Sequence, residues 1–301
     1  MNTPDIQIAG KKYLCRLCGS GSVKMIRETT VRAPLESADF KITDGRYGYM
    51  LSIFECADCG FRQCLDALDT TVYYKALEDP EYETGRKERM HQSRMILRRI
   101  TGIIGGDTAG LRLLDVGAGS GILLEAAAEF GLKAEGVEPS AWLRKTARAH
   151  GCVINADVLP HPEIRGPYDI ITLIDVVEHV SAPLEMIRAA AELLKPGGII
   201  AIATPDVKSA AARLMGWKWW HYRIAHLGYF SRKNLEAVCS KTGLEIISVS
   251  RPSWVFSVGY LRDRFEAYLP GWVLPAKKPW MNNFTVNLNL FDSLLLVAKR
   301  P

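Results

Sequence analysis

The sequence predicts an α/β protein in which a small cysteine-rich module precedes a doubly wound, seven-stranded, mostly parallel sheet. Two observations support this fold class. Six short apolar runs alternate with helical stretches between residues 111 and 250, and a seventh run ends the chain. Two Cys-x-x-Cys-Gly pairs precede residue 61. Continuously apolar strands are buried on both faces, which is typical of a parallel sheet covered by helices.

The composition is that of an ordinary globular protein. The chain has 301 residues, of which 48% are hydrophobic and 24% charged, and this excludes wholesale disorder, collagen and coiled coil. No uncharged apolar run approaches the ~18 residues of a membrane span. The first 15 residues lack an apolar h-region, so we expect a cytoplasmic protein with reduced thiols.

The cysteine-rich module comes first and is expected over residues 1–70. Cys15 and Cys18 form one Cys-x-x-Cys-Gly pair, and Cys56 and Cys59 form the other. Four thiolates suit a closed tetrahedral Zn²⁺ site, and a module of this size needs such a staple. We therefore predict structural zinc in a zinc-ribbon-like module. A redox pair or unrelated thiols are the alternatives.

A helical linker or lid is expected over residues 71–108. Apolar side chains recur at spacings of three and four within its last part, as on one face of a helix. These positions are Met90, Ile96, Leu97, Ile100 and Ile103. Two glycines at 105 and 106 end the helix, which we predict to be continuous over residues 71–103.

The alternating segment is assigned to a domain of residues 109–301. Its apolar runs, expected as strands, are residues 111–117, 132–138, 152–155, 168–175, 197–204, 244–250 and 286–300. Helices are expected at residues 122–130, 141–149, 183–194 and 233–241. Residues 156–169 are too short to hold the helix that the alternation requires. Two insertions, residues 206–231 and 252–283, are expected on the substrate-binding side of this domain.

A glycine loop joins the first strand of this domain to its first helix. Residues 113–121 read Leu-Leu-Asp-Val-Gly-Ala-Gly-Ser-Gly. Glycines at such a junction let the backbone approach a ligand beside free N–H groups of a helix N-terminus. The loop alone fits a dinucleotide site equally well. Glu138, at the end of the second strand, is placed to accept two hydrogen bonds from ribose hydroxyls.

Five motifs in order give the chain a resemblance to class I S-adenosylmethionine-dependent methyltransferases. They are the glycine loop, the acidic end of the second strand, Asn155–Val158, the segment 168–180, and the Leu-Lys-Pro-Gly-Gly turn at 194–198 followed by residues 203–206. The resemblance covers residues 85–250 and implies a Rossmann-like fold that binds S-adenosyl-L-methionine. A nicotinamide-dependent enzyme is the competing interpretation of the loop.

The resemblance also implies which residues hold the cofactor. Gly117 and Gly119 would cradle its methionine part, and Asp157 or the neighbouring backbone would meet the adenine. Asp115 would orient backbone or water, although a simple strand-end cap is the alternative. The full set of expected cofactor residues is Asp115, Gly117, Ala118, Gly119, Glu138, Pro139, Asp157, Val158 and Asp175.

Two histidines are the candidates for a catalytic base. His179 lies in a segment similar to that of quinone-biosynthesis O-methyltransferases, and a histidine there can titrate near neutral pH. His226 lies in the insertion of residues 206–231, which is rich in aromatic residues and is called the aromatic insertion below. The segment His226-x-x-Tyr229-Phe230-Ser231 resembles a motif of sugar C-methyltransferases, which also carry an N-terminal zinc domain. Arg223 and Ala225 replace the Tyr and Glu of that motif. A structural role is the alternative for both histidines.

The expected function is methyl transfer to a small molecule or a glycan or lipid precursor, with O-methylation of an anionic acceptor favoured. Residues 201–301 carry 14 basic and 6 acidic side chains, which favours an anionic partner as readily as a solvated basic face. The alternatives are a sugar C-methyltransferase, an rRNA-type methyltransferase with an RNA-binding zinc ribbon, and an inactive scaffold. Nucleic acid is not the expected partner, because residues 1–100 have a net charge of only +2. The sequence leaves membrane-surface contact and oligomeric state open.

Overall fold

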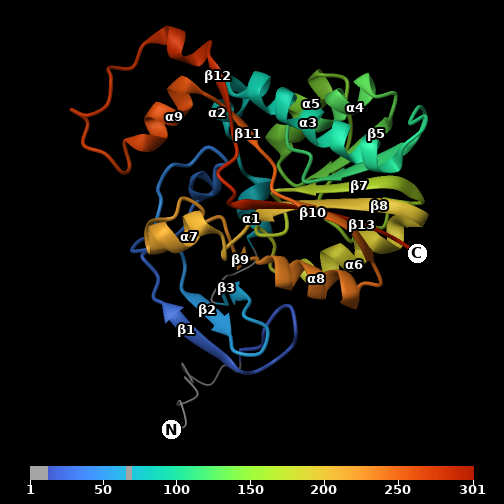
Figure 1. The fold of residues 1–301 in the computed structure, drawn as a ribbon, viewed down its shortest axis with the longest axis horizontal. Helices are drawn as coiled ribbons and strands as arrows, with labels where there is room; N and C mark the ends of the chain where they lie inside the picture. Colours follow the sequence, from blue (N-terminus) through green and yellow to red (C-terminus); the bar gives the residue numbers. More distant parts are fainter. Residues whose placement is uncertain (1–12, 66–69) are drawn as a thin grey trace.

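The computed structural model describes residues 13–65 and 70–301 (Figure 1). The expected module of residues 1–70 therefore contains two stretches, 1–12 and 66–69, that lie outside the described residues. Most of the N-terminal segment from which a cytoplasmic location was predicted lies outside them too. Within the described residues, no helix combines the length and the apolarity needed to cross a membrane.

The seven-stranded sheet has the order β10-β13-β8-β7-β4-β5-β6. The five strands from β8 to β6 in this order run parallel to one another, whereas β13 runs antiparallel to both of its neighbours, β8 and β10. The strands are β4 (Arg112–Val116), β5 (Lys133–Glu138), β6 (Val153–Ala156), β7 (Tyr168–Ile174), β8 (Leu194–Pro205), β10 (Glu245–Ser250) and β13 (Ser293–Lys299). The predicted mostly parallel, seven-stranded sheet is confirmed.

Helices cover both faces of this sheet (Figure 1). Along β4, Leu113 packs with α3 and α4 on one face, whereas Leu114 packs with α6 and α8 on the other. This alternation follows from the period of two in a strand, and it explains why the strands are apolar throughout. The helices are α3 (Arg86–Ile104), α4 (Ile122–Glu129), α5 (Ala141–Ala149), α6 (Pro183–Leu193) and α8 (Arg232–Lys241). As expected, no helix is assigned between β6 and β7.

A second sheet carries the N-terminal cysteines. It has four strands in the order β1-β2-β3-β9, and all its pairings are antiparallel. Three strands come from the N-terminal part, and the fourth comes from a distant point in the chain, within the insertion of residues 206–231. They are β1 (Val23–Arg27), β2 (Ile53–Cys56), β3 (Arg62–Gln63) and β9 (Gly228–Tyr229). The N-terminal part is thus built into the rest of the molecule.

The predicted continuous helix over residues 71–103 is wrong. The segment forms three helices, α1 (Thr71–Lys75), α2 (Pro80–Thr84) and α3. Pro80 starts α2 at a position where its missing N–H costs nothing. Asp79 is buried and turned toward Thr43, whose backbone N–H and hydroxyl donate to its two carboxylate oxygens at 3.0 and 2.8 Å. A tertiary contact therefore interrupts the helical pattern.

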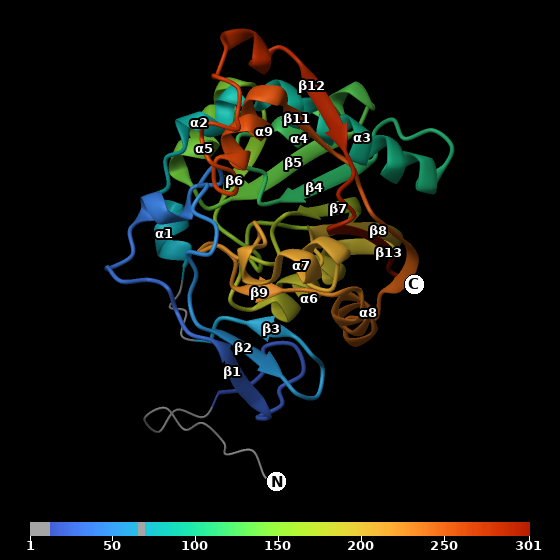
Figure 2. The ribbon, with the colours of Figure 1, turned by 60° about the vertical axis from the view of Figure 1, so that its left-hand side comes forward.

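The insertion at residues 252–283, which showed no period in the sequence, forms part of a lobe at the opposite end of the molecule from the N-terminal sheet (Figure 2). Its hairpin pairs β11 with β12 in an antiparallel register. Gln92 of α3 ties β11 to the body, because its amide donates to Ser253 O at 2.8 Å and accepts from Val255 N at 3.1 Å. The lobe elements are β11 (Trp254–Ser257), α9 (Val258–Phe265), η3 (Pro279–Asn282) and β12 (Thr285–Leu288).

Three short elements complete the region between the two sheets. They are η1 (Ser37–Phe40), α7 (Ala210–Met215) and η2 (Gly216–Lys218). The first follows β1 and the other two open the aromatic insertion. Phe40 is fully buried and stacks on Tyr73 of α1 with ring centroids 4.7 Å apart. Phe40 also clusters with Ile224 and Ala225, so the N-terminal part, α1 and the aromatic insertion share one small hydrophobic cluster.

Candidate functional site

A cavity of about 1580 Å³ lies at the carboxyl ends of β4, β5 and β7. Strand β4 has β5 on one side and β7 on the other, so the chain reverses its winding direction here, and open α/β sheets bind their ligands at such a point. All eleven residues expected from the sequence to hold the cofactor or act as a base line this one cavity. The topology therefore brings together residues that span more than a hundred positions.

The glycine loop folds tightly over the end of β5. Gly117 has a φ of +73°, and a Cβ atom there would come within 2.7 Å of Val176 Cγ2. Its N–H and that of Ala118 donate to Val137 O at 2.9 and 3.0 Å. These two N–H groups are therefore bonded within the protein, because the loop folds back onto β5 before α4 begins. The loop offers close backbone approach.

Glu138 joins the loop to the second strand. Its Oε2 accepts from Gly119 N at 3.0 Å and its Oε1 accepts from Ser140 N at 2.8 Å. Each carboxylate oxygen has a second lone pair, so two ribose hydroxyls can still be accepted. Burial raises the pKa of this carboxyl to about 7, although the two backbone donors oppose the shift.

Three aspartates surround the same end of the sheet. Asp115 is buried and accepts from Thr172 Oγ1 at 2.6 Å, and its removal from water raises its pKa to about 7. Asp175 follows β7 with a φ of +53°, which turns its side chain toward the cavity. Although that side chain is accessible from the cavity, its depth in the fold raises its pKa to about 7. Asp157 pairs with Lys75 of α1 at 2.9 Å.

His179 and His226 lie against each other, with ring centroids 4.7 Å apart and perpendicular planes. His179 Nδ1 lies 2.9 Å from Ala225 O, which can only accept, so Nδ1 carries the hydrogen and Nε2 keeps its lone pair. Burial, followed by the charge of Arg223, lowers the pKa of His179 to about 3. Burial, His179 and Arg223 also hold the pKa of His226 well below its ordinary value. Both imidazoles are therefore neutral at pH 7.

Glu178 completes a buried cluster with the two histidines. One ligand atom from each residue lies within 4.8 Å of the others, a spacing that a metal ion can bridge. Its Oε2 accepts from Thr204 Oγ1 at 3.0 Å, whereas Oε1 is buried without a hydrogen-bond partner among the described residues. Burial and the neighbouring Asp175 raise the pKa of Glu178 well above its ordinary value. Its proton is therefore held more tightly than that of a carboxyl in water.

Sequence reasoning missed three residues of this cavity. Tyr74 of α1 places its hydroxyl 2.8 Å from His179 Nδ1. Arg89 of α3 stacks over Tyr82, and its Nε has no hydrogen-bond partner among the described residues. Arg223 was noted only as a departure from a motif, yet it lines the cavity. Nothing in the sequence marks Tyr74 or Arg89, because only the packing of α1 and α3 brings them here.

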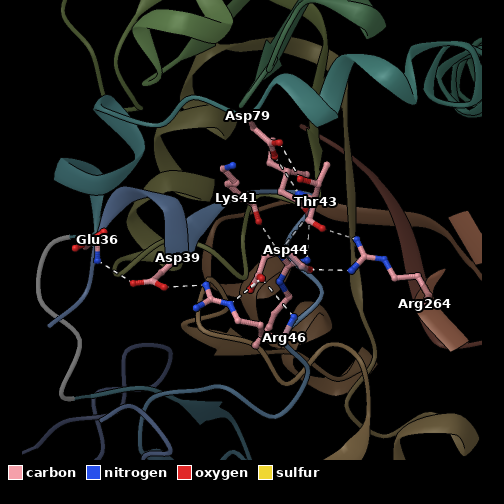
Figure 3. A network of polar contacts seen from close by, with 10 residues as sticks. Glu36, Asp39, Lys41, Thr43, Asp44, Arg46, Asp79 and Arg264 are labelled. Atoms are coloured by element: carbon pink, nitrogen blue, oxygen red, sulfur yellow. Dashed lines mark hydrogen bonds and ion pairs between the residues drawn. The ribbon is translucent and has the colours of Figure 1, made fainter. Parts of the chain in front are cut away.

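A strap of N-terminal chain, which we define as residues 41–47, closes one side of the cavity. Arg264 of α9 reaches the strap and donates to Thr43 O at 2.7 Å and Asp44 O at 3.0 Å, beside the contact of Asp79 with Thr43 (Figure 3). Arg223 donates to Lys41 O at 2.7 Å in the same strap. Segments from three distant parts of the chain therefore meet in one wall of the cavity.

The four cysteines of the two pairs gather at the far end of the N-terminal sheet. Cys15 Sγ lies 3.5 Å from Cys59 Sγ, and Cys18 Sγ lies 3.6 Å from Cys56 Sγ. Thiolates around tetrahedral zinc stand about 3.8 Å apart, given Zn–S bonds of about 2.3 Å. All four sulfur atoms lie within 4.8 Å of one another. The donor set and its spacing fit Zn²⁺.

Helix α8 packs directly on these cysteine pairs. Asn234 donates to Cys59 O at 2.9 Å, and Lys241 donates to Leu17 O at 2.8 Å. Phe61 packs against Phe230, which precedes the helix, with ring centroids 4.9 Å apart. The cysteine pairs therefore share a hydrophobic core with the large sheet.

Comparison with known proteins adds sequence and fold relatives. Residues 86–249, more than half of the chain, match the methyltransferase domain family. The ubiquinone biosynthesis O-methyltransferase of Caulobacter vibrioides is 39% identical over 103 residues, which cover 32% of this chain and 41% of that protein. Its counterpart from Bordetella avium is 38% identical over 109 residues, covering 34% and 45%. The chain thus spans less than half the length of these two relatives.

Two solved structures share the fold. A chain of the Haloferax volcanii complex between the Trm112 methyltransferase activator and a methyltransferase superposes with a TM-score of 0.56 at 16% identity, covering 78% of this chain and 99% of that one. Magnesium protoporphyrin IX methyltransferase from Synechocystis, with bound SAH, gives 0.50 at 14% identity, covering 76% and 91%. The sheet, the ordered motifs and the family match agree: this chain belongs to the methyltransferase domain family and has the fold of the class I methyltransferases.

Proposed function

We propose that the protein methylates a hydroxyl group of a small molecule or of a glycan or lipid precursor. The observation that carries this proposal is the pair of neutral, buried imidazoles, His179 and His226, in the same cavity as the glycine loop and Glu138. A hydroxyl must lose its proton when it is methylated, and a neutral imidazole can accept that proton. The sequence relatives named above are O-methyltransferases.

The cofactor is assigned to the half of the cavity formed by the ends of β4, β5 and β6. Glu138 would accept from the ribose hydroxyls, and Asp157 with Val158 would face the adenine. The loop of Gly117, Ala118 and Gly119 would lie along the methionine part. Arg89, whose Nε is unpartnered among the described residues, is the candidate for the methionine carboxylate. Bound S-adenosylmethionine supplies a methyl group that its sulfonium already activates.

The chain's own contribution is then positioning and proton transfer. Nε2 of His179 keeps its lone pair because Nδ1 donates to Ala225 O. An acceptor hydroxyl held beside Nε2 would donate to it, and its proton would pass to the imidazole as the oxygen gains the methyl group. Tyr74 and Ala225 hold the ring in place. His226, in contact with His179, is the second candidate base.

Zinc is proposed as a structural ion held by Cys15, Cys18, Cys56 and Cys59, because the sulfur spacing fits tetrahedral coordination. We also propose the domain division expected from the sequence, with the provision that β9 completes the N-terminal sheet. A cytoplasmic location stays a prediction.

The test uses purified protein and S-adenosylmethionine with a labelled methyl group. The acceptor panel holds phenols, catechols, nucleotide sugars, a lipid-linked sugar and ribosomal RNA, each hydroxyl compound being matched with its O-methyl ether. Label transfer to a hydroxyl compound but not to its ether, with a methoxy product by mass spectrometry, supports the proposal. Label confined to RNA or to a carbon atom contradicts it.

A further inference from the structure

Arg223 presents an unusual charge at the acceptor side of the cavity. Its Nη2 donates to Lys41 O at 2.7 Å, and further bonds to Ile42 O fix the plane of the guanidinium against the strap. Its Nε is buried and has no hydrogen-bond partner among the described residues. Nor does any described carboxylate form an ion pair with it. A guanidinium in such a position keeps both its charge and a free donor.

The surroundings compensate this charge only in part. Burial raises the pKa of Asp175 to about 7, so this carboxyl is partly ionised at pH 7, and it raises the pKa of Glu178 well above its ordinary value. The other titratable groups on which Arg223 acts are tyrosines and histidines, and none of them carries a negative charge at pH 7. They are Tyr47, Tyr74, Tyr229, His179, His221 and His226. A buried cation without a partner is unfavourable, so a ligand that brings an anion here gains a strong, charge-assisted contact.

We propose that Arg223 is the specificity-determining residue of the acceptor subsite, where it binds a carboxylate or phosphate group of the acceptor. This inference rests on the proposed function and narrows its substrate class. The acceptor then has two parts, a hydroxyl that reaches the histidines and an anion that reaches Arg223. Since Arg223 acts electrostatically on both histidines, the bound anion also raises their proton affinity.

That second effect couples recognition to proton transfer. Burial is the main cause that lowers the pKa of His179 and of His226, and without the anion the charge of Arg223 lowers both pKa values further. An anion at the guanidinium offsets this charge and moves both pKa values upward, toward the range in which an imidazole is an efficient base at neutral pH. An acceptor that lacks the anion is therefore penalised twice, in binding and in proton transfer.

The experiment uses full-length protein saturated with S-adenosylhomocysteine and labelled at its histidine rings for NMR. Benzoate, its neutral isostere benzamide and inorganic phosphate are titrated separately while the imidazole signals are followed. We expect saturable shifts of the signals of His179 and His226 with benzoate, phosphate or both, and none with benzamide. Shifts with benzoate alone would indicate an acceptor that carries a carboxylate, and shifts with phosphate alone would indicate a phosphorylated acceptor. If neither anion gives saturable shifts, or if benzamide acts equally, the inference is overturned.

Variants separate recognition from a purely structural role. Arg223→Gln should lower the affinity for the anion by roughly tenfold or more, in line with the loss of a charged hydrogen bond. Arg223→Lys should retain part of that affinity. Arg264→Gln is the matched control, because Arg264 also tethers the strap through backbone carbonyls. Equal losses in both Gln variants would show that Arg223 only holds the strap. Each variant is first checked for an unchanged melting temperature, and Arg223→Lys serves if the Gln variant unfolds.

The outcome is independent of the proposed reaction. Anion binding that depends on Arg223, together with no methoxy product from any acceptor, would retain the subsite and reject O-methylation. A methoxy product without any anion response would do the reverse.

Discussion

The two halves of the cavity are built in different ways. Apart from Arg89 of α3, the cofactor half consists of strand ends and the loops that directly follow them, within one stretch of the chain from Asp115 to Val158. The acceptor half draws on the strap, α1, the end of β7, the aromatic insertion and α9. Its key contacts join residues far apart in sequence, such as Tyr74 with His179 and Arg223 with Lys41.

This difference teaches where specificity resides. Parallel strands and tight loops are fixed by backbone pairing, so the cofactor half has little freedom to vary. The acceptor half is held by side-chain hydrogen bonds to carbonyls, as with Arg264 and the strap. We therefore expect substitutions in one half to leave the other largely unaffected, and the following predictions test that separation.

The largest effect is expected from the candidate bases. His179→Gln or His226→Gln should lower turnover by roughly 10²–10⁴, because proton removal from the acceptor loses its base. Affinity for S-adenosylhomocysteine, measured by calorimetry, should not change. His221→Gln is the matched control. The ring of His221 stacks on that of His226 with centroids 5.8 Å apart, but its polar contact is with Asp292. Full turnover in both single variants would return the two histidines to a structural role.

Glu138→Ala tests the cofactor half. Two hydrogen bonds from ribose hydroxyls to a charged acceptor should be lost, each contributing about 1.5–3 kcal/mol. We expect affinity for S-adenosylmethionine to fall by about 10² or more in a calorimetric titration, while the anion response of the histidines persists. Glu138→Gln keeps the shape and should lose less. An unchanged affinity in the Ala variant would reject the ribose assignment.

Cys15→Ser tests how far the zinc site reaches. The variant should release zinc, as measured by elemental analysis. It should also disturb β9, which pairs with β3, and hence His226, because Cys64 N donates to Leu227 O at 2.8 Å. Misplacement of such a group can cost up to about 10² in turnover. Cofactor affinity should stay unchanged.

Cys152→Ser is the control for the cysteine substitution, since Cys152 lies beside Gly121, away from the four clustered thiols. It should keep both zinc and turnover. Native protein without stoichiometric zinc, or a Cys15→Ser variant with full turnover, would contradict the proposed coupling.

The smallest effect is a pH dependence of cofactor binding. Burial raises the pKa of Glu138 to about 7, so this carboxyl becomes neutral as the pH falls below that value. The ionised form is the better acceptor for ribose hydroxyls, and affinity should therefore decrease by up to about tenfold per pH unit below pH 7. Calorimetry at pH 6, 7 and 8 measures this decrease.

Glu138→Gln should remove most of the dependence, and any remaining slope would report Asp115 and Asp175, whose pKa values are also raised to about 7. Identical pH profiles for the two proteins would assign the titration to another group.

Much of the fold could be predicted from the sequence, because it depends on local patterns. Continuously apolar runs such as residues 168–175 require burial on both faces, and they became central strands. The spacing of the cysteine pairs likewise predicted their clustering. The continuous helix over residues 71–103 failed partly at a local signal, because Pro80 cannot stand inside a helix. The contact of Asp79 with Thr43, which holds the break in place, crosses 36 positions and has no local pattern.

The sequence by itself determined the parallel sheet, the glycine loop, the acidic strand end and the cysteine pairs, since each depends on backbone conformation or on residues close in the chain. Only the tertiary structure decided that β9 joins the N-terminal sheet, that Tyr74 reaches His179, and that Arg223 keeps an unpartnered Nε beside the histidines. These contacts form between segments that carry no pattern of their own. Their partners are chosen by how whole elements pack, and that packing is a property of the complete fold.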